Sequence, residues 1–342
     1  MGEAGGSEKI YQIGGVSVRS PIWLAPLAGV TTRTFRSFHR DMGAGLVHTE
    51  MVSAIGLSYR NKKTGDMIGN EGEASGPIAL QLFSPDADSL ARGAELALCL
   101  RRFDALEINM ACPMPKVTKK GSGASLLARP DESRRMVERA VKFGLPVWAK
   151  MRIIPEQAGG IGTEEFADGL FGAGAELLMI HGRTPAQRYE GTSDKAKVCA
   201  AARKFPGRIA ASGDYYAPSD AMRYLNGGCV AVLAARGALR DAYLIPKTNA
   251  ALGMNVPREL TDPTLSDEIS ALIALGRLGA ANEGERFTMV LARRMLAGLF
   301  KGFDGAANIR KTCALCRDWA SLEKFLTGLL ESLTATHAIV IE

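Results

Sequence analysis

Residues 104–152 contain the pattern that decides the fold, and they read DALEINMACPMPKVTKKGSGASLLARPDESRRMVERAVKFGLPVWAKMR. Two short apolar runs, 104–109 and 146–152, flank a segment with helical spacing. Pro130, followed by two acidic residues, is typical of a helix start, and Gly144 is typical of a helix end. A buried strand, a helix and a second buried strand in this order predict one unit of a parallel α/β fold.

The same rhythm extends in both directions, from residue 21 to about residue 245. Apolar runs separated by Gly or Pro recur eight times, at 22–28, 45–51, 77–83, 104–109, 146–152, 176–181, 208–212 and 229–235. They are almost continuously apolar, which is expected of parallel strands buried on both faces. Eight strand–helix units predict a (β/α)8 TIM barrel of the α/β class, with a doubly wound sheet as the alternative.

The pattern changes after about residue 246. Pro257 and Pro263 bracket a polar linker, and residues 265–342 are rich in Leu and Ala at helical period. The sequence therefore predicts a barrel domain over 1–250, followed by a small C-terminal helical bundle domain over 260–342.

Composition limits the function classes. The chain has 342 residues, of which 46% are hydrophobic and 23% charged, so it can bury a core and is not a disordered protein. Its net charge of +6 leans modestly toward polyanionic partners. No apolar run approaches the roughly 20 residues that span a bilayer, and the N-terminus lacks the pattern of a secretory signal. We expect a cytoplasmic monomer with no membrane association.

The six cysteines are too few for a disulfide scaffold and fit a reducing compartment. Cys313 and Cys316 form a single C-x-x-C pair, and a second pair that would complete a zinc site is missing. We expect no metal and interpret both as packing residues.

Polar side chains come at the ends of most of the predicted strands. They are Gln81, Asn109, Lys150, Arg152, His181, Arg183, Ser212, Asp214 and Arg236, with Cys112 shortly after the fourth strand. Singly, such a Lys or His is more often structural than functional, and a lone Cys is often a small buried residue. The carboxyl ends of barrel strands nevertheless form the rim where TIM-barrel enzymes work, so together these residues predict an active site.

The last two strand ends predict a phosphate site. Gly213 and Gly237 let backbone N–H groups approach an anion, and Arg236 adds charge at a helix start. Together with Lys150, such a site suggests a phosphorylated cofactor, and FMN fits because a lysine can stabilise the anion of a reduced flavin. Gln81 and Asn109 could bond the polar edge of the flavin.

Five motifs carry a resemblance to a known family. They are APLAGVTTRTFR at 25–36, ALEINMACPMPKV at 105–117, KMRI at 150–153, HGRT at 181–184 and ARGAL at 235–239. Together they resemble the tRNA-dihydrouridine synthase family, with the bacterial B-type branch as the most similar. The resemblance covers nearly the whole chain, and Asn109-x-x-Cys112-Pro113 is its most specific part.

The resemblance implies an FMN-bound barrel, a helical domain that helps to hold tRNA, and NADPH-dependent reduction of the uridine C5–C6 double bond. By position, the implied FMN contacts are Pro26, Leu27, Ala28, Gln81, Lys150, His181, Ser212, Gly213, Asp214, Ala235 and Arg236. Cys112 is the implied proton donor. We assign to the tRNA substrate Asn109, Arg152, Arg183, Lys116, Arg293 and Arg294. No dinucleotide fingerprint is present, so NADPH rests on the resemblance alone.

The chain departs from the family pattern at three places. Ser212 and Ala235 stand where relatives usually have Asn and Gly, and Arg293-Arg294 where many have a His nearby. The methyl group of Ala235 would reduce the approach of the backbone to a phosphate and so weaken FMN retention.

Two further segments could contact RNA. Arg286, Arg293, Arg294 and Lys301 fall on one face of a predicted helix, a pattern that is also common on a plain solvated face. Residues 113–124, which hold Lys116, Lys119 and Lys120 between small residues, have the composition of a mobile lid.

Two alternatives stay open at this stage. One is an FMN barrel that acts on a free pyrimidine, as a dihydroorotate or dihydropyrimidine dehydrogenase does, which would not need a basic helical domain. The other is a catalytically silent tRNA-binding protein, which would not need Cys112, Lys150 and His181.

Overall fold

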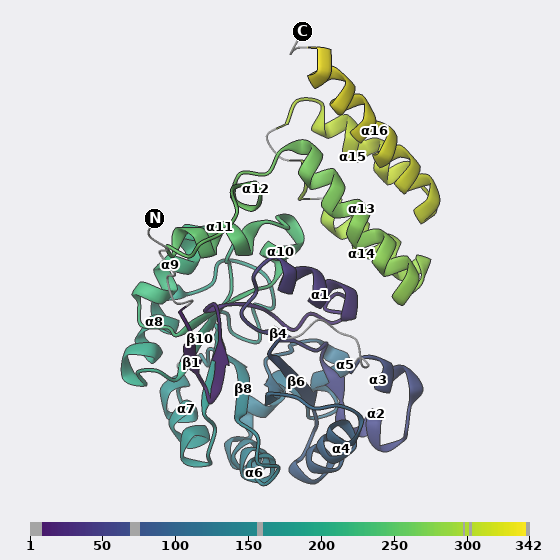
Figure 1. Ribbon diagram of the computed structural model, residues 1–342. Coiled ribbons are helices and arrows are strands. Elements are labelled where there is room, and N and C mark those ends of the chain that lie inside the picture. Colours follow the sequence, from purple (N-terminus) through teal and green to yellow (C-terminus); the bar gives the residue numbers. More distant parts are fainter. Residues whose placement is uncertain (1–8, 69–75, 156–159, 297, 301–302, 340–342) are drawn as a thin grey trace, which may run out of the picture.

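The computed structural model describes residues 9–68, 76–155, 160–296, 298–300 and 303–339, and at its centre parallel strands close into a barrel (Figure 1). The barrel strands are β3 (Ile22–Leu24), β4 (Val47–His48), β5 (Val52–Ser53), β6 (Ile78–Phe83), β7 (Ala105–Met110), β8 (Val147–Arg152), β9 (Leu177–His181), β10 (Ile209–Ser212) and β11 (Ala231–Ala234). Their order is β4-β3-β11-β10-β9-β8-β7-β6-β5, and β4 also pairs with β6. That pairing closes the barrel, since β4 and β5 are two pieces of one strand position. The predicted TIM barrel is confirmed, and the doubly wound alternative is wrong.

Helices alternate with the strands, and most of them cover the outside of the barrel. They are α1 (Arg33–Asp41), α2 (Ala54–Ser58), α3 (Lys62–Asp66), α4 (Ala87–Leu100), α5 (Pro115–Thr118), a 3-10 helix (Gly123–Ala128), α6 (Pro130–Val141), α7 (Thr163–Gly172), α8 (Lys195–Lys204), α9 (Pro218–Asn226), α10 (Arg236–Arg240) and α11 (Leu244–Ala251). Strand residues that point outward, such as Leu106 and Ile108, pack against these helices in the larger core cluster.

The residues that point into the barrel form a second, inner core. Along β7, Ala105 belongs to this inner core, whereas its neighbour Leu106 belongs to the outer one, as expected from the two-residue period of a strand. The inner face of β7 therefore continues through Glu107 to Asn109. The same period turns Gln81, Lys150 and His181 toward the barrel axis, at the end where the strands finish.

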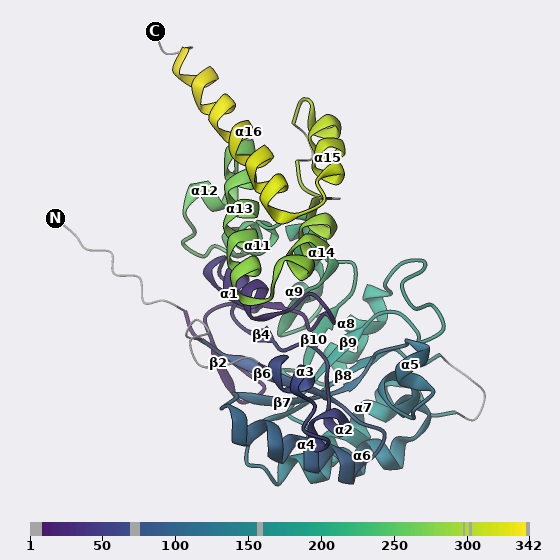
Figure 2. The ribbon, with the colours of Figure 1, turned by 90° about the vertical axis from the view of Figure 1, so that its right-hand side faces the viewer.

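An N-terminal hairpin closes the opposite end. Strands β1 (Tyr11–Ile13) and β2 (Val16–Val18) pair antiparallel, and their apolar side chains join the inner core. The carbonyl of Gly14 accepts a 2.8 Å hydrogen bond from the indole of Trp148, which is stacked on Trp23. Gly14 has φ +55°, and a Cβ there would collide with Trp148. Figure 2 shows the hairpin at one end of the barrel and α5 at the other.

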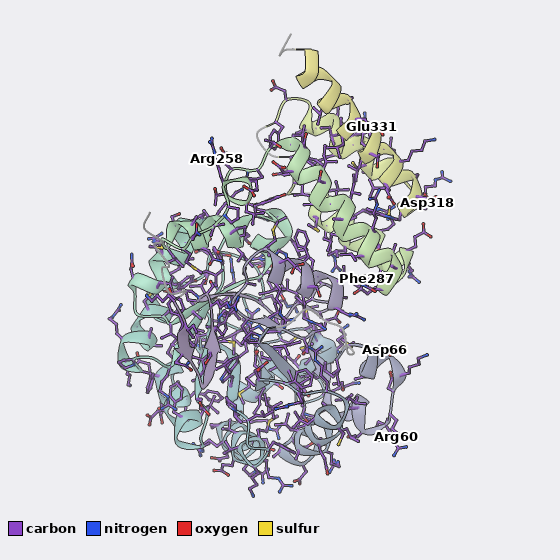
Figure 3. All side chains as sticks on the ribbon, viewed as in Figure 1. Arg60, Asp66, Arg258, Phe287, Asp318 and Glu331 are labelled. Carbon is purple, nitrogen blue, oxygen red and sulfur yellow. The ribbon has the colours of Figure 1, made fainter. Side chains whose placement is uncertain are left out.

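Four further helices follow the barrel, the first two packing on α1 and α10 and the last two lying farther out (Figure 1). They are α13 (Leu265–Asn282), α14 (Glu285–Leu296), α15 (Ala306–Leu315) and α16 (Trp319–Ile339). The short α12 (Arg258–Thr261) lies in the connection, where Figure 3 labels Arg258. At the contact with α1, the carboxylate of Glu283 accepts a 2.9 Å hydrogen bond from the N–H of Thr34.

The described part of the chain was also compared with the features of membrane proteins, disulfide-bonded proteins and metal-binding proteins. None of its helices is both long and apolar enough to cross a membrane. Its six cysteines are all free thiols. No three His, Cys, Asp or Glu side chains gather there in a way that could hold a metal ion.

Candidate active site

A cavity of about 510 Å³ opens at the rim where the barrel strands end. Sixteen of the eighteen predicted site residues line it: Pro26, Leu27, Ala28, Gln81, Asn109, Cys112, Lys116, Lys150, Arg152, His181, Ser212, Gly213, Asp214, Ala235, Arg236 and Arg294. Its volume lies within the range of ordinary small-molecule and cofactor sites. The barrel thus gathers residues that are up to 268 positions apart, which is the distance from Pro26 to Arg294.

Cys112 is held by its backbone. Its N–H donates to the side-chain oxygen of Asn109 at 2.9 Å, and its carbonyl accepts from the N–H of Ala124 at 2.9 Å. Gly123, at φ +63°, allows this close return of the chain, because a Cβ there would lie 2.6 Å from the Cys112 carbonyl. The half-buried thiol therefore has a fixed position in the wall of the cavity.

Lys150 presents a buried ammonium to the cavity. Its side chain is 8% exposed, and within the described residues its Nζ has no hydrogen-bond or ion-pair partner. Burial lowers the pKa of Lys150 to about 8, against the opposing effect of the Glu107 charge. A buried cation without a partner is costly, so this position fits an anionic ligand.

His181 is neutral and has a defined tautomer. Burial, together with the positive charges of Lys150 and Arg152, lowers the pKa of His181 to about 2. Its Nδ1 lies 3.2 Å from the N–H of Arg183 and accepts from it, because a backbone N–H can only donate. The ring proton is therefore on Nε2, and His181 is a hydrogen-bond donor in the cavity wall.

The predicted phosphate end combines small residues with a cation. Ser212 ends β10 and Gly213 follows it, and Gly213 adopts φ +116° with no room for a Cβ beside Ser193. Arg236 begins α10 and bonds Asp214 at 3.1 Å. Burial alone would raise the pKa of Asp214, but the hydrogen bonds from Arg183 and from the Ser193 N–H hold that pKa below its usual range.

Arg183 and Arg293 lie outside the cavity. Arg183 is buried and bonds both oxygens of Asp214, at 2.9 and 2.7 Å, and its Nε donates to the carbonyl of Glu190. These contacts indicate a role in fixing the loop after β9. Arg293 is exposed and donates to the carbonyl of Cys316.

Arg152 and Arg294 reach the cavity by different routes. Arg152 is buried and donates to the carbonyls of Ala111 and Thr184, so it ties two rim loops together. Arg294 comes from α14 and donates to the carbonyl of Gly29 at 2.9 Å. The predicted basic face is shorter than expected, because α14 ends at Leu296, and Lys301 lies outside the described residues.

The cavity also contains residues that the sequence patterns did not single out. The exposed Tyr189 and the half-buried Tyr216 line it, and the guanidinium of Arg236 lies 5.3 and 5.8 Å from their ring centres. Tyr216 follows Asp214 by two residues, so its position after a strand end was a usable signal. His48 lies deeper, at the end of β4. In the sequence, an ionisable residue within a buried apolar strand could have marked it as a candidate.

Comparison with known families agrees with this geometry. The model of the family described as Dihydrouridine synthase (Dus) matches residues 23–334, which include the whole barrel and most of α13–α16. The chain belongs to the dihydrouridine synthase family. As a dihydrouridine synthase family member it is an enzyme, and its activity is that of a tRNA-dihydrouridine synthase.

Individual relatives cover most of the chain. A probable tRNA-dihydrouridine synthase of Mycobacterium tuberculosis is 31% identical in an alignment that covers 93% of this chain and 84% of the relative. The tRNA-dihydrouridine synthase B of Vibrio vulnificus is 28% identical over 88% of this chain and 92% of its own. The old yellow enzyme of Trypanosoma cruzi, a solved structure, shares the fold with a TM-score of 0.52 at 12% identity, over 74% of this chain and 94% of its own.

Membership of this family decides against both alternatives, the enzyme for a free pyrimidine and the catalytically silent tRNA-binding protein. A match that continues through α13 and α14 includes the helices that an enzyme for a free pyrimidine would not need. The enzyme activity of the family also excludes the interpretation as a silent tRNA-binding protein.

Proposed function

We propose that the cavity binds FMN and that the enzyme uses NADPH to reduce the C5–C6 double bond of a uridine presented by tRNA. The observation that carries this proposal is the buried, unpartnered ammonium of Lys150, which shares one cavity wall with the thiol of Cys112. Together they supply a fixed positive charge and a protonated acid, the two groups that this reduction requires.

The residues present fit an anionic, planar cofactor. Lys150 has no partner among the described residues, His181 offers Nε2–H as a donor, and Arg236 with Ser212 and Gly213 forms a cationic end lined by small residues. This chemistry matches a flavin ring over the strand ends and a phosphate beyond β10 and β11. We propose that Pro26, Leu27, Ala28, Gln81, Asp214 and Ala235 complete the FMN site.

When bound, FMN supplies a hydride to C6 of the base. Because C5=C6 is conjugated to the C4 carbonyl of uracil, negative charge then collects at C5, which needs a proton. The Cys112 thiol holds that proton, and Asn109 fixes its position by accepting the Cys112 N–H. The product gains one hydride and one proton, so the balance is complete.

A stacked uridine cannot reach the floor of the cavity, so the target base must leave the tRNA stack at a cost of a few kcal/mol. We propose that Arg152, Lys116 and Arg294, at the cavity, and the outer face of α14 with Arg293 hold the RNA. In this view residues 1–250 form the catalytic domain and residues 260–342 form the tRNA-binding domain.

Finer assignments belong to the same proposal. The Vibrio vulnificus relative supports placing the chain near the B-type branch. A tRNA substrate and six free thiols fit a cytoplasmic enzyme, and we propose that it acts as a monomer.

The test uses the purified protein and an unmodified tRNA transcript. We expect a yellow protein that releases FMN on denaturation, loses flavin absorbance when NADPH is added, and forms dihydrouridine in the transcript. NADH is the comparison donor. A protein that reduces free pyrimidines or oxidises dihydroorotate, but leaves tRNA unchanged, would contradict the proposal.

A further inference from the structure

A continuous chain of polar contacts descends from Cys112 into the barrel. The N–H groups of Ala111 and Cys112 donate to Asn109 Oδ1, at 3.2 and 2.9 Å. Asn109 Nδ2 then donates to Gln81 Oε1 at 2.9 Å, and Gln81 Nε2 donates to Glu107 Oε1 at 2.6 Å. Because backbone N–H groups can only donate, the direction of every bond in this series is fixed, and Glu107 Oε1 must accept.

At the far end of this hydrogen-bond series, the positions of the protons on His48 are also determined. His48 Nδ1 lies 2.7 Å from the carbonyl oxygen of Leu24. A carbonyl only accepts, so Nδ1 carries a proton. His48 Nε2 lies 3.0 Å from Glu107 Oε2, and both side chains are fully buried.

A proton must lie between His48 and Glu107. In the described part of the chain neither Nε2 nor Oε2 makes an aligned hydrogen bond, and their 3.0 Å approach to each other is an ion-pair contact. Without a proton, two acceptor atoms would face each other at 3.0 Å in an interior without solvent. With the proton on Nε2, the pair is an imidazolium and a carboxylate.

The carboxylate of Glu107 also acts on Lys150. Lys150 on β8 is the register partner of Asn109 on β7. Burial lowers its pKa most; Glu107 and Cys112 favour the ammonium, and Arg152 opposes it. His181, in the same cavity, contributes no charge near pH 7 because its pKa is about 2. Glu107 is therefore the strongest favourable charge on a lysine whose burial lowers its pKa to about 8.

We propose that Glu107, braced by His48, is a positioning residue for the reduction: it fixes the amides of Gln81 and Asn109 behind Cys112 and supplies the negative charge that faces the Lys150 ammonium. Its place in the reaction rests on the proposed function, but its effect on Lys150 does not.

Stability alone does not account for this pair. His48 lies against the inner core, with ring centres 6.2 Å from Trp23 and 6.3 Å from Trp148. Apolar residues of similar volume would fill this space without the desolvation cost of two buried charges. We therefore attribute the charged pair to its effect on its neighbours.

The decisive variant is Glu107→Gln. Its amide oxygen can still accept from Gln81, and its amide nitrogen can donate to a neutral His48, so the contacts persist while the charge is lost. The matched control is Glu132→Gln, which removes another buried carboxylate, one that accepts from the N–H of Ala87 on the outside of the barrel.

The measurement is competitive acetylation of Lys150 across pH, read by peptide mass spectrometry in the flavin-free full chain. We expect the pKa of Lys150 to be about 8 in the wild type and in Glu132→Gln, and to be lower in Glu107→Gln. In the flavin-bound enzyme, the upper limit of the pH–rate profile should fall in the same direction. An unchanged Lys150 titration in Glu107→Gln overturns the inference.

A measurement on the unaltered chain covers the case that Glu107→Gln does not fold. The chain has only four histidines, so ¹⁵N labelling of histidine gives a simple spectrum. We expect one imidazolium at pH 7.5, which His48→Gln removes. A neutral His48 would place the proton on Glu107, abolish its charge and overturn the inference. Neither measurement uses FMN, NADPH or tRNA, so a failure of the proposed function leaves their outcome unaffected.

Discussion

Cys112 is positioned by its backbone and not by its thiol, because its N–H and carbonyl bond Asn109 and Ala124. Cys112→Ala should therefore keep the loop, the bound flavin and its reduction by NADPH. Dihydrouridine formation should fall by ~10²-fold or more, the usual contribution of a positioned general acid. Stopped-flow flavin absorbance measures the first half-reaction, and nucleoside analysis of tRNA measures the second.

Cys316→Ala is the matched control, since this half-buried thiol lies at the end of α15 and donates to a backbone carbonyl of its own helix. Loss of NADPH-driven flavin reduction in Cys112→Ala would show that the thiol has a role other than proton donor.

Lys150→Met replaces the ammonium by an apolar chain of similar length. We expect slower flavin reduction and slower dihydrouridine formation, because a fixed positive charge stabilises the reduced cofactor in both half-reactions. The wild-type rate should fall as pH rises through about 8, where Lys150 loses its proton, and this limb should be missing in the variant. A flavin-reduction rate equal to that of the wild type would remove Lys150 from the mechanism.

The position of a single residue could be predicted from the sequence where the two-residue period of its own strand was enough to place it. Gln81, Asn109 and Lys150 could be placed at the rim because each sits at a fixed position near the end of an apolar run. Arg183 has the same kind of position, yet its guanidinium turns to Asp214, 31 residues later, and fills its bonds there. That pairing is a tertiary contact, and no local pattern encodes it.

At the scale of elements, α14 presents its two arginines differently. Arg294 reaches the cavity and bonds Gly29, whereas Arg293 bonds Cys316 in the connection to α16. If both also contact phosphates, Arg293→Ala with Arg294→Ala should weaken tRNA binding and reduce the slope of log K against log salt by roughly one per lost contact. Because Arg294 lines the cavity, it should account for the larger part of the loss.

Arg277→Ala is the control for this prediction, because its guanidinium is already paired with Glu323 inside the helical part. Titration of tRNA at several salt concentrations gives the slopes. Identical slopes for the wild type and the double variant would leave Lys116, Lys119 and Lys120 as the basic candidates.

The elements themselves followed the sequence closely, with informative exceptions. The run 22–28 predicts seven strand residues, but β3 ends at Leu24, because Pro26 and Gly29 turn the chain across the cavity. Residues 113–124, predicted as a lid, contain a helical turn and the start of a 3-10 helix, with Val117 buried. Apolarity and Gly content do not distinguish a strand from the rim loop that continues it, nor a hinge from a tight turn.

At the scale of the whole molecule, α1 joins the barrel to α13, and it buries His39 between the rings of Phe35 and Phe38. Burial lowers the pKa of His39 to about 3, and among the described residues neither ring nitrogen has a partner. The unfolded chain, with a pKa near 6.5, takes up a proton first as pH falls. The stability contributed by the neutral ring is therefore present above pH 6.5 and is lost toward pH 3.

His39→Leu should remove this dependence, which is worth about 2 kcal/mol between pH 7 and pH 5. The variant should lose less melting temperature than the wild type over that interval, although His181 keeps a dependence of the same sign. Phe38→Leu controls for altered packing without a titrating group. An equal change of melting temperature with pH in the wild type and in His39→Leu across this range would contradict the assignment.

The hairpin of β1 and β2 seals the barrel floor, and the pocket beside it shares no lining residue with the catalytic cavity. The cavity opens at the rim where the strands end, so we expect the electron donor and the RNA to enter it from the same side. Two ligands that compete for the same entrance must bind alternately. The catalytic cycle then divides into reduction by the donor, followed by release of the donor and reduction of the RNA base. Steady-state rates measured at several fixed tRNA concentrations should then give parallel double-reciprocal lines, and excess donor should inhibit by blocking the entrance.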